Sequence, residues 1–228
     1  TASNDPATEL KAIECGADDF LPKPFKGPNL RPRIKMVLSR LERARNCNPL
    51  TGFPGNIIID EEVSKRLKNQ EPLAVCYADL SNFKSFNDYY GYAKGDIVIK
   101  LTARILADAV KQHGGKKDFV GHIGGDDFIV LTDYHRHDKL CHSIIENFDN
   151  LVGYQYNEED RDRGYIETVD RRGNRQKFPI MAIAISVVTN RTRALTGPAQ
   201  IADIASDLKC FIKKNFTKSK VFEDRRSE

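Results

Sequence analysis

The chain has 228 residues, of which 40% are hydrophobic and 30% are charged, enough for one medium-sized domain and an appendage. Its 36 basic and 32 acidic residues leave a net charge of +4, and so small an excess gives no indication of nucleic-acid binding. The sequence has no apolar run long enough to span a membrane and no signal-peptide pattern at its start, so we expect no membrane span.

The first part of the chain predicts a helix, a short strand and a loop. The helical pattern stops at Gly16, the strand is expected over Asp19–Leu21, and the loop covers Pro22–Phe25. An amphipathic helix is predicted over Asn29–Arg45. Five apolar residues form one stripe of it: Leu30, Ile34, Val37, Leu38 and Leu41. The stripe fits equally a connector or dimer seam and a helix packed on its own domain. The breaker cluster Asn46–Pro49 predicts a domain boundary.

The remainder alternates helical and strand patterns. Helices are predicted over Ile57–Leu67, Tyr92–His113, Asp138–Val152 and Pro198–Lys214, and strands over Leu73–Leu80, Phe178–Val188 and Lys220–Phe222. A hairpin is expected over Asp118–Leu131. The polar segment Tyr154–Lys177 contains the turn signal Asp170–Asn174 and predicts an inserted hairpin, solvated or in contact with a partner. Together these patterns predict an α/β sandwich with a mixed sheet.

The five cysteines are scattered and form no Cys-x-x-Cys pair: Cys15, Cys47, Cys76, Cys141 and Cys210. An odd number without paired spacing does not indicate a disulfide framework. We therefore expect reduced, buried thiols and a cytoplasmic protein.

The stretch Gly124-Gly125-Asp126-Asp127-Phe128 lies at the tip of the expected hairpin. The glycines allow a tight turn and a close approach of a ligand to the backbone. Paired carboxylates at such a tip suit a divalent metal, and a metal suits a phosphate. Taken alone, the pentapeptide fits an ordinary glycine-acid turn equally well.

A second acidic element begins at Asp79, at the carboxyl end of a buried strand, where ligands gather in α/β sheets. The turn after it offers backbone N–H groups and Lys84 to phosphate oxygens. Further on, the amide of Asn87 and the carboxylate of Asp96 could read the edge of a guanine base. They are separated by between two and three helical turns, so a shared helical face is possible but not assured.

These motifs, in this order, resemble those of the GGDEF family, the diguanylate cyclases. Asn48–Pro54 resembles the family's opening motif, Asp79–Asp96 its D-x-D-x-F-K-x-x-N-D block, Gly124–Phe128 its signature, and Ser186–Val188 its S-x-G element. The resemblance covers residues 46–222 and implies a mixed sheet like that of nucleotidyl cyclases and the polymerase palm. It also implies a homodimer that condenses two GTP molecules into cyclic di-GMP and two pyrophosphates.

The resemblance also implies roles for individual residues. Asp79, the Leu80 carbonyl and Asp126 would bind Mg²⁺ or Mn²⁺, with Asp126 and Asp127 in the catalytic signature. The residues implied to bind GTP are Ser81, Asn82, Phe83 and Lys84 for the phosphates, Asn87 and Asp96 for guanine, and Lys213, matched to the family's late lysine, for the phosphates.

Several positions depart from the family pattern. Asp127 replaces a glutamate and shortens the side chain by one C–C bond, about 1.5 Å. Substitutions also occur at Ser81, Tyr92, Gly55-Asn56 and Val188. Thr217 stands near the place of a second phosphate-binding Arg, for which Lys218 is a substitute. Gly115 takes the place of the arginine in the R-x-x-D product-inhibition motif that ends at Asp118, so we expect that inhibitory site to be absent.

Residues 16–25 resemble the G-A-x-x-Y-x-x-K-P-F element of a response-regulator receiver domain, with a flavodoxin-like fold. The resemblance implies that Lys23 and Thr1 contact a phosphoryl group, that the bond before Pro24 is cis, and that a sensor histidine kinase acts upstream. The implied organisation is the C-terminal part of a receiver over 1–28, its last helix or connector over 29–46, and a GGDEF domain over 47–228.

The histidines carry weaker signals. His135, His137 and His142 cluster near a strand-to-helix turn, but solvated loop histidines explain them better than a metal site does. His122 alternates with apolar residues beside the signature and is expected to be structural.

Two functional hypotheses follow. The first is a receiver-controlled diguanylate cyclase, favoured by the retained Asp79, Lys84, Asn87, Asp96 and Asp126. The second is a weak or inactive GGDEF domain that binds GTP or cyclic di-GMP and regulates through dimerisation or a partner, favoured by Asp127.

Overall fold

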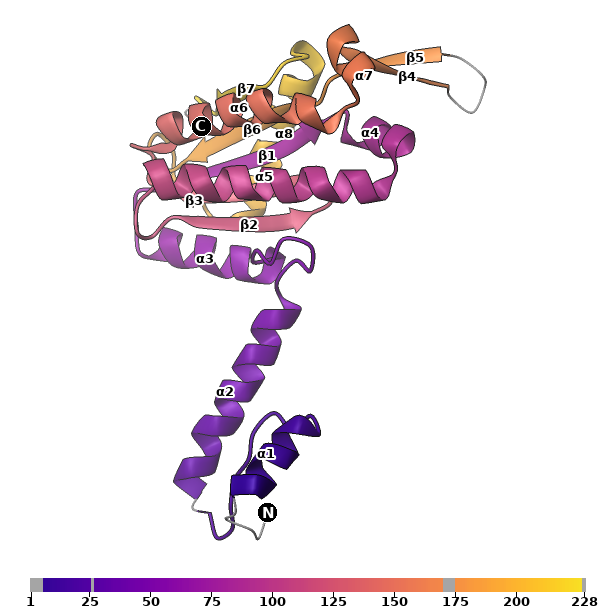
Figure 1. Cartoon of the computed structure of the whole chain (residues 1–228). Helices are drawn as coiled ribbons and strands as arrows, with labels where there is room; N and C mark the ends of the chain where they lie inside the picture. Colours follow the sequence, from indigo (N-terminus) through magenta and orange to yellow (C-terminus); the bar gives the residue numbers. More distant parts are fainter. Residues whose placement is uncertain (1–5, 26, 170–174, 227–228) are drawn as a thin grey trace. The chain divides into compact units, whose positions relative to one another are not determined.

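The computed structural model describes residues 6–25, 27–169 and 175–226 (Figure 1). The chain divides into two compact units, Thr1–Cys47 and Asn48–Glu228. Two features of the sequence prediction, Thr1 and the turn over Asp170–Asn174, lie outside the described residues. None of the helices in the described ranges is long and apolar enough to cross a membrane.

The first unit contains two helices, α1 (Pro6–Glu14) and α2 (Gly27–Arg45), close to the bounds predicted. The bond between Lys23 and Pro24 is cis, as the receiver resemblance implied. The strand predicted over Asp19–Leu21 is wrong, because this segment has no strand conformation. A strand needs a neighbour for its backbone hydrogen bonds, and the described residues of this unit supply no second strand.

The second unit is built on a five-stranded sheet in the order β2-β3-β1-β6-β7. Its strands are β1 (Ala74–Ser81), β2 (Phe119–Gly124), β3 (Asp127–Thr132), β6 (Ala182–Thr189) and β7 (Lys220–Glu223). Strand β1 pairs antiparallel with β3 and β6, and β7 pairs parallel with β6. The predicted mixed sheet flanked by helices is therefore confirmed.

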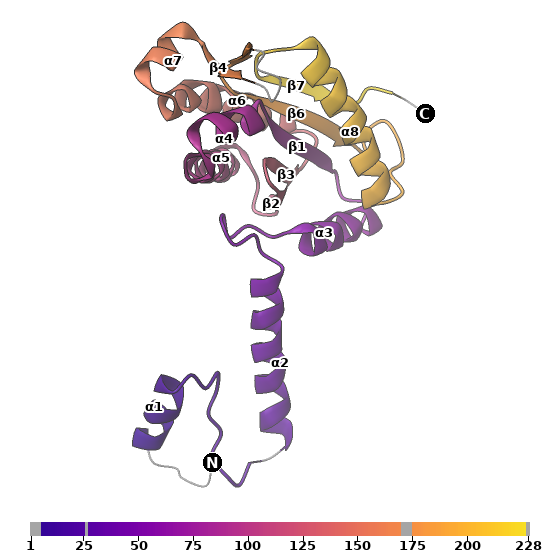
Figure 2. The ribbon, with the colours of Figure 1, turned by 90° about the vertical axis from the view of Figure 1, so that its right-hand side faces the viewer.

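Helices cover both faces of this sheet (Figure 2). On one face lie α4 (Phe83–Tyr90), α5 (Tyr92–His113) and α6 (His137–Val152), and on the other α3 (Asn56–Lys68) and α8 (Pro198–Asn215). Side chains of a strand alternate between faces, so Cys76 and Ala78 of β1 enter the cluster with α5 and α6, whereas Val75 enters the cluster with α3 and α8.

An insert lies between α6 and β6. It consists of a 3-10 turn η1 (Gly153–Gln155), a helix α7 (Glu158–Arg163) and a two-stranded hairpin β4 (Tyr165–Val169) and β5 (Arg175–Pro179). The hairpin was predicted, whereas the short, charged α7 was not. The predicted strand Phe178–Val188 is two strands, since β5 ends at Pro179, whose missing N–H cannot join an inner ladder, and β6 begins at Ala182.

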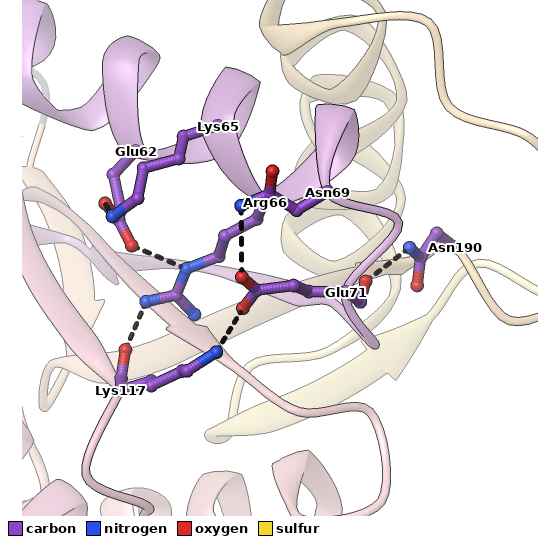
Figure 3. Close-up of polar contacts among 7 residues, drawn as sticks. All are labelled: Glu62, Lys65, Arg66, Asn69, Glu71, Lys117 and Asn190. Atoms are coloured by element: carbon purple, nitrogen blue, oxygen red, sulfur yellow. Dashed lines mark hydrogen bonds and ion pairs between the residues drawn. The ribbon is translucent and has the colours of Figure 1, made fainter.

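A polar network holds the sheet at the amino end of β1 (Figure 3). The guanidinium of the buried Arg66 pairs with Glu62 at 2.8 Å and donates a hydrogen bond to the carbonyl of Lys117. The ammonium of Lys117 in turn pairs with Glu71 at 3.3 Å. Asn190, which follows β6, donates to the Glu71 carbonyl at 2.9 Å, so the network joins α3 to segments next to β1, β2 and β6.

The expected burial of the thiols is confirmed for only some of the cysteines. Cys76 on β1 and Cys141 on α6 are buried, with their sulfur atoms 3.7 Å apart. Cys15 and Cys210 are exposed, so the expectation of burial is wrong for them. Cys210 belongs to the solvent-facing side of α8, and Cys15 lies at the end of α1, whose apolar residues are themselves exposed.

Truncation of Phe148 tests how far the α5–α6 cluster supports the fold. Phe148 is 0% exposed, and we expect Phe148→Ala to lower the free energy of unfolding by about 3–5 kcal/mol, since lost burial and a residual cavity add. Chemical denaturation measures this loss. The control Phe216→Ala changes a side chain that is 37% exposed and should have a clearly smaller effect; equal losses would contradict this account of the core.

Candidate active site

Three carboxylates meet at the carboxyl end of β1. Asp79 lies directly opposite Asp127 in the antiparallel pairing of β1 with β3, and Asp126 occupies the turn before β3. One ligand atom from each of the three lies within 4.8 Å of the others. The turn forms because Gly124 and Gly125 adopt φ values of +152° and +56°, which residues with a Cβ rarely tolerate. Oxygen donors so arranged fit a hard divalent cation such as Mg²⁺ or Mn²⁺.

Burial shapes the charge of these acids. Asp79 is only 3% exposed, and burial raises its pKa to about 6 although two lysines oppose the shift. Burial also raises the pKa of Asp126, and the neighbouring Asp127 adds to that rise. Negative charge concentrated in a poorly solvated site is stabilised only by nearby cations, so the site selects positively charged partners.

Helix α8 supplies such cations. The ammonium of Lys209 lies 2.6 Å from Oδ1 of Asp127 and also pairs with Asp79, while Lys213 pairs with the other oxygen of Asp79. Burial opposes the charged form of Lys209, but its hydrogen bonds to Asp127 and Asp79 raise its pKa overall. Sequence reasoning selected Lys213 and missed Lys209. The spacing of four residues, which places both lysines on one face of α8, was the available signal.

The predicted phosphate-binding residues surround the junction between β1 and α4. Ser81 ends β1, Asn82 precedes α4 in a left-handed conformation with φ +65°, and Phe83 and Lys84 open the helix. The side chain of Lys84 is exposed. The junction therefore brings a helix N-terminus and a cation to the end of the strand that bears Asp79.

The two predicted guanine readers lie on different helices. Asn87 belongs to α4 and Asp96 to α5, and Gly91 with φ +87° separates the helices, so a single shared helix is ruled out. Oδ1 of Asn87 is buried without a hydrogen-bond partner among the described residues. The same oxygen packs against Gly95 of α5, the neighbour of Asp96 in the sequence. Asp96 is exposed.

His122 connects two loops behind the carboxylates. Its Nε2 lies 3.0 Å from the Gly125 carbonyl, and its Nδ1 lies 3.0 Å from Oγ1 of Thr51 in the loop before α3. Because a carbonyl only accepts, Nε2–H donates to Gly125, and the Thr51 hydroxyl donates to Nδ1. The ring also stacks on Phe128, with centroids 4.2 Å apart. The structure thus gives His122 a role in supporting the signature turn, consistent with the structural role expected for it.

Gly115 and Asp118, at the positions of the family's inhibitory motif, are both occupied by contacts within the chain. A Cβ on Gly115 would lie 1.9 Å from Nη1 of Arg136, so this guanidinium already fills the space beside Gly115. Oδ2 of Asp118 accepts a hydrogen bond from the Thr132 hydroxyl at 2.7 Å.

The clustered histidines contact protein groups, including Oε2 of Glu223 on β7, which lies 3.7 Å from Nε2 of His137. Nδ1 of His137 donates to the Tyr134 carbonyl at 2.6 Å, and His142 pairs with Asp138 on its own helix. His135 is exposed. In the part of the chain that the structure describes, the three aspartates are the only group of potential ligands that meets metal-site geometry.

Comparison with known proteins fits this geometry. The sequence model of one family, described as "Diguanylate cyclase, GGDEF domain", matches residues 46–162, just over half of the chain. The chain belongs to the GGDEF family.

Relatives of the GGDEF domain include two curated cyclases. Diguanylate cyclase DgcZ of Escherichia coli is 32% identical over 102 residues, a match that covers 44% of this chain and 33% of DgcZ. Diguanylate cyclase DgcP of Pseudomonas aeruginosa is 34% identical over 104 residues, covering 42% of this chain and 15% of DgcP. The chain thus matches a third or less of the length of these relatives.

Among solved structures, diguanylate cyclase SiaD of Pseudomonas aeruginosa, in complex with its activator SiaC, superposes with a TM-score of 0.58. The sequences are 17% identical, and the alignment covers 95% of this chain and 74% of SiaD. At that identity the likeness concerns the fold alone.

Removing His122 tests its support of the signature turn. His122→Phe keeps an aromatic ring against Phe128 but loses both hydrogen bonds, so the free energy of unfolding should fall by about 1–3 kcal/mol. Burial lowers the pKa of His122 below its ordinary 6.5. The unfolded chain then binds this proton at higher pH than the folded chain, so wild-type stability should decrease as the pH falls below 6.5, towards the folded-state pKa.

Chemical denaturation between pH 5 and 8, about the range in which histidine titrates, measures both effects. The variant should lack this contribution to the pH dependence. His135→Phe, a change of an exposed histidine, is the matched control and should behave like wild type. An unchanged stability profile in His122→Phe would contradict the assigned contacts.

Proposed function

We propose that the chain is a diguanylate cyclase that condenses two GTP molecules into cyclic di-GMP and two pyrophosphates. The observation that carries this proposal is the convergence of Asp79, Asp126 and Asp127 within 4.8 Å, beside the ammonium of Lys209. A site that combines hard-metal donors with cations suits the transfer of a phosphoryl-type group. Each subunit of a homodimer holds one GTP, and the 3′-hydroxyl of each GTP attacks the α-phosphate of the other.

In this proposal Asp79, Asp126 and the Leu80 carbonyl hold Mg²⁺ or Mn²⁺. When bound, the ion neutralises charge on the triphosphate and stabilises the attacking and leaving oxygens. Asp126 also helps to deprotonate the attacking hydroxyl. Asp127 belongs to the same catalytic signature, and its pairing with Lys209 supports a role for that lysine beside the metal site.

The substrate contacts follow from the surroundings of this cluster. The segment Ser81–Lys84 and Lys213 bind the phosphates, and the proximity of Lys209 to Lys213 supports adding Lys209 to that set. Asn87 and Asp96 read guanine, and the packing of the Asn87 amide against Gly95, the neighbour of Asp96 in the sequence, supports this assignment because it brings the two groups to one place.

We further propose that the cyclase is the output of a response regulator. Residues 1–28 would be the end of a receiver domain and residues 29–46 its last helix or connector, with Lys23 and Thr1 next to the phosphoryl group and a histidine kinase upstream. The resemblance of residues 16–25 to the receiver element supports this assignment. Product feedback at Gly115 and Asp118 should be weak, because Arg136 fills the space beside Gly115.

A second candidate is a GGDEF domain that binds GTP or cyclic di-GMP without turnover and acts through dimerisation or a partner. Asp127 favours it, because a side chain one methylene shorter than glutamate shifts a carboxylate in the site. A displacement of about 1 Å can lower a rate on the order of 100-fold.

Production of cyclic di-GMP from GTP and Mg²⁺, followed by chromatography, tests the first candidate. Asp126→Asn should lower the rate on the order of 10³-fold, because about 4 kcal/mol of charge stabilisation is lost with a metal-binding carboxylate. Asp127→Glu should raise the rate by about tenfold or more if the short side chain limits turnover.

The exposed Asp162, whose side chain is 72% accessible, gives the matched control Asp162→Asn, which should keep the wild-type rate. Absence of product from wild type and from Asp127→Glu, together with measurable GTP binding, would select the second candidate.

Gly95 offers a separate test of guanine binding. A Cβ at this position would lie 1.9 Å from Oδ1 of Asn87, so Gly95→Ala must displace the amide. We expect the Kd for GTP to rise by about tenfold or more, as for a lost hydrogen bond to a base edge. Calorimetric titration measures it, and Ala93→Gly, a change at an exposed position of the same helix, serves as the control. Undiminished GTP affinity in Gly95→Ala would exclude Asn87 as a guanine contact.

A further inference from the structure

The insert between α6 and β6 holds the carboxyl end of α4. The Tyr90 hydroxyl donates a hydrogen bond to Oδ2 of Asp160, and the backbone N–H of Asn157 donates to the same hydroxyl at 3.3 Å. Tyr90 is the last residue of α4, whereas Asn157 and Asp160 belong to the start of α7. Tyr90 and Asp160, which are far apart in the sequence, are therefore joined at the carboxyl end of α4, the helix proposed to bind guanine.

Asp160 is itself fixed from several sides. It is 1% exposed, its carboxylate also pairs with the guanidinium of Arg163, and its backbone N–H donates to the Asn157 side chain at 2.7 Å. Burial raises the pKa of Tyr90 to about 12, and the hydrogen bond to Asp160 adds to that rise, so the phenol remains a donor at neutral pH. A buried carboxylate is stabilised only when hydrogen-bond donors or cations surround it. The contact between Tyr90 and Asp160 therefore requires a defined orientation of both side chains.

Aromatic packing continues this contact along α4. The ring of Tyr156 lies edge-on to Phe86 and Tyr90, with centroid separations of 5.0 Å and 5.6 Å. The Tyr156 hydroxyl accepts a hydrogen bond from the backbone of Met181 at 2.9 Å, immediately before β6. The packing therefore connects α4 to the central sheet through the insert. In Figure 1, α4 and the insert lie toward the right-hand end of the sheet.

The amino end of α4 is held by the same insert. The side-chain amide of Asn82 donates to the carbonyl of Pro179 at 3.3 Å, at the end of β5. On another side of α4, Asn87 packs so closely against Gly95 of α5 that no Cβ fits between them. Asn87 consequently lies in a helix that is fixed at both ends by the insert and touched by α5, and a small rotation of α4 would move its amide.

We propose that Tyr90 and Asp160 are positioning residues that orient α4 and thereby set how well Asn87 distinguishes guanine from adenine. The proposal rests on the proposed function, in that Asn87 is taken to read guanine. Neither residue touches the nucleotide. Their contact holds α4 against Tyr156 and α7. The backbone hydrogen bonds within α4 stabilise the helix but do not fix its orientation.

Calorimetric titration of the full chain with GTP and with ATP tests this proposal through Tyr90→Phe and Asp160→Asn. Each variant removes one half of the same contact. We expect the Kd for GTP to rise by about tenfold while the Kd for ATP changes little, because the loss falls on base recognition. The double variant should lose less than the sum of the two single variants, since both changes break the Tyr90–Asp160 contact, while Asp160→Asn also weakens the ion pair with Arg163.

Matched controls separate positioning from stability. Tyr154→Phe alters a phenol that is 69% exposed in the same insert, and Asp162→Asn alters an exposed carboxylate of α7. Val63→Ala alters a side chain that is 2% exposed in the α3–α8 cluster, so it lowers the melting temperature without touching α4. All three should keep the wild-type ratio of ATP to GTP dissociation constants.

An equal rise of both dissociation constants in Tyr90→Phe, or a changed ratio in Val63→Ala, would reduce the contact to a structural one and overturn the proposal. Wild type that binds GTP without forming product would end the proposed cyclase activity but leave the positioning role standing on the binding ratios. Wild type that does not prefer GTP over ATP would overturn the positioning role itself.

Discussion

The ionic state of Asp79 is the constraint on which the site depends. Asp79 is 3% exposed at the end of a central strand, where water solvates charge poorly. That burial raises the pKa of Asp79, and the ammonium groups of Lys209 and Lys213 oppose the rise. The β1–β3 pairing and the glycine turn bring two further acids beside it in a cation-binding geometry. Removal of the lysines would leave an uncompensated buried charge, which is more costly than loss of an exposed ion pair.

Much of the fold could be predicted because local patterns and tertiary packing agree. The helix over Tyr92–His113 was predicted closely, since apolar periodicity dictates it. The hairpin of β2 and β3 was also predicted closely, since the glycines Gly124-Gly125 dictate its turn. Prediction failed where tertiary partners decide. Asp19–Leu21 has a strand-like composition but no ladder to join, and α7 is a short polar helix stabilised by the Asn157 cap and by contacts of Asp160 with distant residues.

For the candidate site too, residues in local sequence motifs could be predicted, whereas contacts that depend on tertiary packing could not. Asp79 and Asp126 were selected because the ordered motifs that contain them resemble those of the GGDEF family; the glycine-acid turn alone fitted an ordinary turn equally well. The ion pair between Lys209 and Asp127 was missed, because it depends on the rotation of α8 against the sheet. The separation of Asn87 and Asp96 onto two helices likewise depends on the backbone at Gly91, which sequence spacing does not reveal.

The pairing of β1 with β3 ties the acidic site to the folding of the whole domain. Asp79 and Asp127 face each other across the ladder, and a slip of one residue in either strand would send one carboxylate to the opposite face of the sheet. The site is therefore a reporter of correct strand register: a partly folded form that lacks this pairing has no cluster to offer. Any ligand that binds there stabilises the complete sheet and not just a surface loop, so its binding free energy adds to the global unfolding transition.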